Sequence, residues 1–398
     1  MSLPRVVETS KQYRQNVLAA LSRGGWGADL EQTALAAAQR LARARQLTFT
    51  PRAGEAALAA ARTLLFVMAP LLAADRLWGG SGSWRWAAAP LVLLAGMGLY
   101  GGVAILHDMA HGSFLPSRRL NVLFGHAIAP LLLMEFGGFR RSHLDHHRHS
   151  QSTVDPKRFG VEHKEGTTDP EHCSLDLFPA PLRGPLRLGA SMVALPLRVR
   201  QLVYLVVMPA VMGPAVLFFS GEFSIARRDW RRLESWRATI ASAVFLALIY
   251  AWSPRLLALF LIALLIGHSF TFHVFAAHLS PHQVYWTTAR RADTADALNV
   301  SDIHCGALPR WLGHGLSDYH SLHHLSPTIP CYHLRAAEAM VAAELAQVRA
   351  PGINLLEPAS CAVLLDAVFR GVAYKNSESW DYAGDGGLRR IATPDSDG

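Results

Sequence analysis

Long apolar segments separated by short polar ones run through the middle of this chain. Two of them, at about residues 57–74 and 86–106, are joined by a glycine-rich loop, and two more, at about 238–252 and 256–272, are joined by a turn that contains a proline. Each segment approaches the ~20 apolar residues that a helix needs to cross the hydrocarbon core of a bilayer. The pattern therefore predicts an all-α integral membrane protein with four transmembrane helices in two hairpins.

Two further apolar segments are predicted to enter the membrane without crossing it. The segment at about 122–136 is too short to span comfortably. The segment at about 199–219 is long enough, but Pro209 and Pro214 interrupt it, and a proline removes a helical hydrogen bond. We expect a re-entrant or membrane-surface helix pair at the first and an embedded hairpin at the second, each buried against protein.

Polar stretches divide the chain into three predicted regions. Residues 1–55 are predicted to form a peripheral helical region in the cytosol, and residues 56–345 to form the membrane domain. Within that domain, the polar residues 280–330 and an amphipathic helix at 336–348 are predicted to cap the spanning helices. Residues 346–398 are predicted to form a cytosolic C-terminal region with a flexible tail, because its glycines and acidic end provide little to bury.

Charge gives the membrane prediction an orientation. The formal net charge is +8 and comes mainly from arginines that flank the apolar segments. The positive-inside bias places such residues in the cytosol, and no nucleic-acid partner is needed to explain them. The excess of arginine and alanine is typical of a GC-rich bacterial genome, so we expect the bacterial inner membrane. The four cysteines show no CxxC spacing and are expected to be buried free thiols.

All 19 histidines lie between residues 107 and 333, and eight of them form three clusters next to apolar segments. Residues three and four apart lie on one face of a helix, so each cluster can turn its rings toward a common point. Eight imidazoles exceed the four ligands of one zinc ion but would suit two metal ions, and imidazole leaves Fe, Zn, Cu and Ni open. The clusters have the spacings HxxxH, HxxHH and HxxHH: His107 and His111; His143, His146 and His147; His320, His323 and His324.

A shared metal site would constrain the topology, because all three clusters must then reach the same side of the membrane. A single crossing at 122–136 would separate the first two clusters. Five arginines between residues 227 and 237 favour the cytosol for the loop after 199–219. With both segments embedded, the two hairpins return the chain to the cytosol near His107 and near His278, and the site faces the cytosol.

Other familiar metal sites are not evident in the sequence. It contains no HExxH of zinc proteases and no set of Glu-x-x-His pairs as in soluble di-iron bundles. A histidine-based divalent-cation transporter or sensor stays open as an alternative of another class. Eight histidines outside the clusters are expected to be structural: His126, His149, His163, His172, His282, His304, His314 and His333.

The three clusters, in this order and membrane setting, resemble the histidine boxes of the membrane fatty acid desaturase superfamily, which also contains acyl hydroxylases and carotenoid ketolases. The resemblance covers about residues 60–345. The residues that flank the clusters resemble those of acyl-lipid desaturases in particular. These are Ser142 before the second cluster, and Pro327 and residues 329–333 after the third.

The resemblance implies two iron ions, dioxygen as co-substrate and electrons from an external carrier. It also implies a ninth histidine ligand after the fourth spanning helix, for which His278 is the best match. Some acyl-CoA desaturases have an asparagine four residues earlier, where this chain has Val274. Since no His-Pro-Gly-Gly cytochrome motif is present, we expect a separate donor, such as an acidic ferredoxin steered by the cytosolic arginines.

The functional hypothesis is oxygen-dependent desaturation of a fatty acyl chain carried on a lipid, on CoA or on a carrier protein. The main alternative is a hydroxylase or ketolase that acts on a lipid or carotenoid at the same iron site. Asp108, Asp145 and Asp318 are candidates to orient ligand imidazoles as hydrogen-bond acceptors. An alternative with equal weight is that these three residues are solvated or cap helices.

Overall fold

The structure is a computed structural model, and it is mostly helical, which confirms the all-α prediction. The predicted peripheral region at 1–55 lies almost wholly outside the described residues, and the division into three regions stays a prediction. The described residues are 49–149, 196–220, 224–278, 286–287, 300–345, 352–361, 364, 374–375, 380–382 and 388–390.

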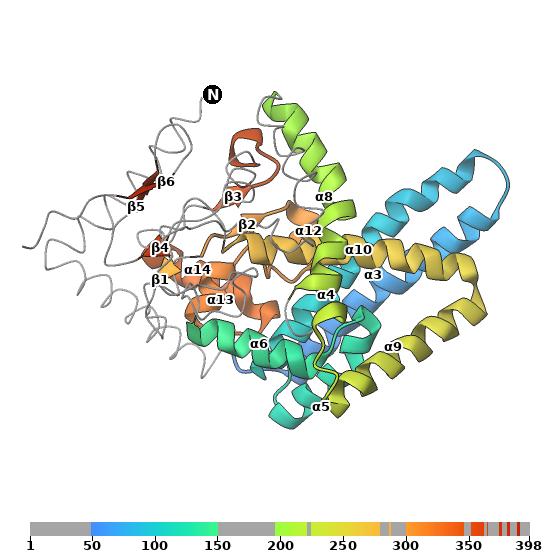
Figure 1. Cartoon of the computed structure of the whole chain (residues 1–398), viewed down its shortest axis with the longest axis horizontal. Coiled ribbons are helices and arrows are strands. Elements are labelled where there is room, and N and C mark those ends of the chain that lie inside the picture. Colours follow the sequence, from blue (N-terminus) through green and yellow to red (C-terminus); the bar gives the residue numbers. More distant parts are fainter. Residues whose placement is uncertain are drawn as a thin grey trace, which may run out of the picture.

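Four helices within the described ranges are long and apolar enough to cross a membrane. In Figure 1 they extend together to one side of the molecule. This confirms the predicted four spanning helices. They follow one another as two hairpins, the first with the 3-10 helix η1 (Ser83–Ala87) in its turn: α3 (Ala53–Gly79) with α4 (Ala88–His111), and α9 (Leu233–Trp252) with α10 (Pro254–Ala276).

Exposed side chains show where this bundle meets lipid. Trp84 and Trp252 are 75% and 78% exposed at one end of the bundle. Trp230 and Trp236 lie at the other end, where the indole N–H of Trp236 donates to the Trp230 carbonyl at 2.9 Å. Tryptophan gathers at both membrane interfaces, and exposed leucines such as Leu248 lie between these ends. The chain is therefore an integral membrane protein.

Glycines let the neighbours of α4 approach it closely. A Cβ built on Gly98 would lie 2.9 Å from the backbone of Phe66 in α3, and one built on Gly101 would collide with the Leu312 carbonyl. Small residues permit this kind of close packing between membrane helices. The end of α4, which carries His107, is thus held firmly against its neighbours.

The chain between the first two histidine clusters bends sharply. Helix α5 (Arg118–Ile128) continues into η2 (Ala129–Leu132), and α6 (Phe136–His149) follows after a bend of 107°. Leu133 lies at the bend in the left-handed conformation, with φ 56°, and the buried Arg228 donates to its carbonyl at 2.7 Å. The bend agrees with the predicted re-entrant or membrane-surface helix pair.

The predicted embedded hairpin at 199–219 is wrong. These residues belong to one continuous helix, α8 (Leu197–Phe219), which includes Pro209 and Pro214. A proline removes one backbone donor from a helix, and packing against neighbouring helices can compensate for that loss. Helix α8 packs on α10, and in Figure 1 it runs across the bundle at a steep angle to the spanning helices. The segment is thus accommodated without a turn.

The remaining elements lie mainly at the histidine-bearing end of the bundle. Helix α14 confirms the helix predicted at 336–348 as far as residue 345, and the last three predicted residues lie outside the described ones. Two strands within the predicted flexible tail, β5 and β6, pair antiparallel. Strands β2 and β3 pair in parallel, as do β1 and β4. The bounds are η5 (Ile225–Arg227), β1 (Trp286–Thr287), β2 (Ile303–His304), α12 (Ala307–Leu312), α13 (His320–Leu325), η6 (Cys331–His333), α14 (Leu334–Leu345), β3 (Ile353–Asn354), β4 (Tyr374–Lys375), β5 (Trp380–Tyr382) and β6 (Leu388–Arg390).

The contact of α8 with α10 predicts the effect of adding a methyl group. A Cβ on Gly213 would collide with the Leu265 carbonyl, so Gly213→Ala should lower the midpoint of thermal unfolding in detergent. Alanine by itself would favour the helix by about 0.5–1 kcal/mol. Gly54→Ala is the matched control, because a Cβ on this helical glycine would meet no atom within 4 Å. Its midpoint should stay unchanged or rise, and equal midpoints for both variants would contradict the packing.

Candidate metal centre

Four separate parts of the chain bring histidines to one place. The first cluster lies at the end of α4, the second on α6 and the third on α13, while His278 follows α10. Ring contacts connect all nine predicted ligands, with neighbouring centroids from 4.3 to 6.2 Å apart. The structure therefore brings together every histidine for which the sequence predicted a metal-binding role.

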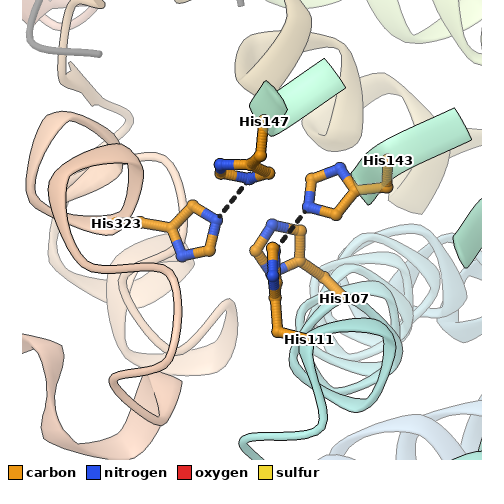
Figure 2. A group of neighbouring side chains, drawn as sticks. All are labelled: His107, His111, His143, His147 and His323. Atoms are coloured by element: carbon orange, nitrogen blue, oxygen red, sulfur yellow. Dashed lines mark hydrogen bonds between the residues drawn. The ribbon is translucent and has the colours of Figure 1, made fainter. Parts of the chain in front are cut away.

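Five of these histidines form a first group, in which one nitrogen of each lies within 4.8 Å of the others. Figure 2 shows their rings turned toward one another from α4, α6 and α13. The Nε2 atoms of His111 and His143 are 2.8 Å apart, and those of His147 and His323 are 3.0 Å apart. The fifth member is His107.

His146, His278 and His324 form a second group by the same distance, and all three are buried. His320 adjoins them, because its Nε2 lies 3.0 Å from that of His278 and its ring centroid lies 4.7 Å from that of His324. The two groups are neighbours, since the rings of His147 and His324 stack with centroids 4.4 Å apart.

The two HxxHH clusters divide between the groups in opposite senses. On α6, His143 and His147 belong to the first group, and His146 belongs to the second. On α13 the arrangement is reversed: His324 lies in the second group and His320 beside it, and His323 belongs to the first group. Successive helical residues point about 100° apart, so each adjacent pair of histidines can supply one ring to each group.

The spacing of the nitrogens fits metal ions. Two nitrogens that bind one ion at about 2.1 Å and at a right angle would lie about 3.0 Å apart, and three nitrogen pairs here lie at 2.8 to 3.0 Å. His324 Nε2 is buried with no hydrogen-bond partner among the described residues, which is unusual for a polar atom and calls for an explanation such as an ion. The clusters are therefore able to bind metal.

Burial also keeps two imidazoles of α13, those of His323 and His324, in the form that binds metal. Removal from water, and then the neighbouring histidines, lower the pKa of His323 and the pKa of His324 well below the usual value. Both rings are thus neutral near pH 7. A metal ion requires neutral imidazole, so neither ring must lose a proton when an ion binds.

Asp108 is the predicted orienting acid whose surroundings agree best with that role. It is buried, and its Oδ1 lies 3.3 Å from His107 Nδ1. Its Oδ2 accepts a hydrogen bond from the Cys331 N–H, which ties the end of α4 to η6. A carboxylate on the second ring nitrogen fixes the orientation of a ligand histidine.

The other two predicted acids have different partners. Asp145 pairs with Arg148 at 3.0 Å, and both side chains are exposed, which agrees with the solvated alternative. Asp318 is buried, and its Oδ1 lies 3.0 Å from His304 Nδ1 and accepts from Arg310 Nε at 2.8 Å. His304 is not one of the nine candidate ligands, so these contacts of Asp318 hold the neighbouring loop together.

Glu135 holds the start of α6, and sequence reasoning missed it. Its Oε1 accepts from the Gly138 N–H at 3.2 Å, and its Oε2 accepts from Ser235 Oγ at 2.6 Å. The first N–H groups of a helix have no partner within the helix, so this carboxylate satisfies one of them and joins α6 to α9. A single acid at the end of an apolar segment, just before a histidine cluster, is the signal that could have identified it.

Several histidines outside the nine have other partners. His333 Nε2 lies 3.0 Å from Glu55 Oε2. Burial lowers the pKa of His314 to about 3, and Arg62 donates to its Nδ1, so this ring is neutral. These contacts agree with the structural roles expected from the sequence. Three of the remaining histidines lie outside the described residues: His163, His172 and His282.

Residues 84–352, more than half of the chain, match the fatty acid desaturase family. The chain belongs to this family. It is 26% identical over 268 residues to a chloroplastic omega-6 fatty acid desaturase of Spinacia oleracea, which covers 64% of this chain and 52% of that protein. It is 26% identical over 288 residues to an sn-1 oleoyl-lipid 12-desaturase of Anabaena variabilis, with 66% and 72% covered. The match thus spans about half the length of the spinach relative.

At the position where some acyl-CoA desaturases have the asparagine described above, this chain has Val274. Val274 is buried and lies in a small apolar cluster with Tyr100, Ala104 and Leu316. The side chain at this position therefore offers no polar atom to the second histidine group, and the candidate ligands of that group are histidines.

The division into two groups predicts a selective loss of metal. His146→Ala should remove one nitrogen from the second group while the first keeps all five, so metal per purified chain should fall from about two ions toward one. Elemental analysis of the detergent-purified protein measures this content. His126→Ala is the control, because His126 is exposed and lies outside both groups. Full metal retention in His146→Ala, or an equal loss in the control, would remove His146 from the site.

Proposed function

We propose that this chain catalyses the oxygen-dependent desaturation of a fatty acyl chain at a centre of two iron ions. The observation that carries the proposal is the pair of adjoining histidine groups at the end of a bundle with four candidate membrane spans. Imidazole suits several transition metals, and membership of the fatty acid desaturase family favours iron among them.

When bound, the ions would supply the activation of dioxygen that removing hydrogen from an unactivated methylene requires. The part of the protein is to present neutral imidazoles, to exclude water and to hold the acyl carbon at a fixed position. The residues proposed to hold the ions are His107, His111, His143, His147 and His323 for one, and His146, His278, His320 and His324 for the other.

We propose an acyl chain carried on a membrane lipid as the substrate. The relative from Anabaena variabilis is named an sn-1 oleoyl-lipid 12-desaturase. The first histidines end the spanning helix α4, and His278 follows the spanning helix α10, so the groups lie where an acyl chain can arrive from the bilayer. An acyl group on CoA or on a carrier protein would instead approach from water.

We propose that electrons arrive from a separate acidic carrier of the ferredoxin type, on the cytosolic side of a bacterial inner membrane. Arg119 on α5 and Arg335 on α14 are exposed, on helices that pack against elements carrying the histidines. Exposed positive charge steers an acidic partner to such a surface. The same arginines favour the cytosolic side by the positive-inside bias.

Expression in a bacterial host tests the proposed reaction directly. Lipids are separated by class, and double bonds are located by mass spectrometry, with and without air. We expect a new double bond in lipid-bound acyl chains that requires dioxygen and that disappears in His146→Ala but not in His126→Ala. Purified protein should contain iron and take up oxygen only when substrate and a reduced carrier are supplied.

Other products would select other functions. A hydroxy acid or a ketocarotenoid would contradict desaturation and assign a hydroxylase or ketolase to the same site. Zinc binding with ion flux and no oxygen uptake would contradict the enzyme and support a cation transporter. Modified acyl-CoA that appears before modified lipid would overturn the proposed lipid carrier while leaving the reaction in place.

A further inference from the structure

Residues 301–303 tie together two parts of the chain that supply the second histidine group. The Ser301 N–H donates to the Ala277 carbonyl at 3.1 Å, directly before His278. The Ile303 N–H donates to the Ser317 carbonyl at 2.8 Å, shortly before α13 begins. This short stretch therefore fixes the end of α10 relative to the start of α13.

Asp302, between these two residues, holds α13 with its side chain. Its Oδ1 accepts from the Ser321 N–H at 2.8 Å, and its Oδ2 accepts from Ser321 Oγ at 2.9 Å. Helix α13 has six residues, and the first N–H groups of a helix have no partner within it. Because two hydrogen bonds from one carboxylate reach the same residue, they restrict both the position and the rotation of this short helix.

The backbone that carries Asp302 is itself fixed. The Asp302 carbonyl accepts from the Ile353 N–H at 2.8 Å, and the His304 carbonyl accepts from the Leu355 N–H at 2.9 Å. These bonds belong to the parallel pair β2–β3. Ile303, Ile353 and Leu355 are buried, so the carboxylate is presented from a packed strand.

We infer that Asp302 is a positioning residue for the second histidine group. Ser321, which it holds, lies between His320 and His324, and the adjacent stretch fixes the chain next to His278. Three of the four histidines in or beside this group thus depend on residues 301–303. Of the five in the first group, His323 is the one that α13 supplies. The inference rests on the proposed binding of two metal ions.

Release of iron from the purified full chain tests this inference. The protein is loaded with ferrous iron, and the transfer of iron to a ferrous chelator is followed by absorbance. In Asp302→Ala one of the two ions should be released about 10- to 100-fold faster, as for other residues that orient metal ligands. The other ion is held by only one histidine of α13, His323, so its release should be accelerated much less.

Two further variants separate positioning from general stability. Asp302→Asn keeps an acceptor for the Ser321 N–H and should restore most of the slow release, whereas Ser321→Ala removes one of the two bonds and should accelerate the same ion by less. Asp75→Ala is the matched control, because Asp75 accepts from Ser253 Oγ at 2.8 Å at the far end of the bundle. It should lower the midpoint of thermal unfolding without changing either release rate.

Unchanged release in Asp302→Ala, equal acceleration of both ions, or the same selective effect in Asp75→Ala would overturn the inference alone. If Asp302→Ala does not accumulate, Ser321→Ala decides: selective acceleration supports the inference, and unchanged or equal release overturns it. A wild-type chain that retains no iron after loading would instead overturn the proposed function together with the inference.

Discussion

The close approach of nine imidazoles at the end of a membrane bundle is the interaction on which the rest of this structure depends. Polar groups taken out of water cost free energy unless they find partners, and here imidazole nitrogens approach one another at 2.8 to 3.0 Å. Such a cluster contributes little to folding without metal. It must therefore be held by contacts outside it, and the architecture can be understood as a set of such supports.

Each element that carries histidines has its own support. Close packing at glycines fixes α4 against its neighbours. The guanidinium of Arg228 donates to the Leu133 carbonyl and holds the bend before α6. Two buried carboxylates then act in the same way on the two HxxHH helices, Glu135 at the start of α6 and Asp302 at the start of α13. Both bind a backbone N–H that the helix cannot satisfy and a serine hydroxyl. These supports are made by residues other than the candidate ligands, so they hold the elements in place without occupying the histidine nitrogens.

Sequence alone predicted which histidines come together better than it predicted the residues that support them. Histidine spacing is a local property, so the clusters could be recognised, and the resemblance added His278. Segment length likewise predicted the four spanning helices. Helix α8 was predicted wrongly because its prolines are local signals, whereas its packing on α10 is a tertiary contact. Asp302 was missed for the same reason, since Ser321 is 19 residues away along the chain and no sequence pattern connects the two.

Assignment of each histidine to one of the groups is a further property that spacing cannot give. Both HxxHH clusters have the same sequence pattern, yet α6 gives two rings to the first group and α13 gives one. The difference depends on how each helix is rotated about its axis. A rotation of α13 by the ~100° between successive residues would carry His323 and His324 away from their groups. A six-residue helix has few contacts of its own to prevent this, and a double hydrogen bond from a rigid strand supplies that restraint at Ser321.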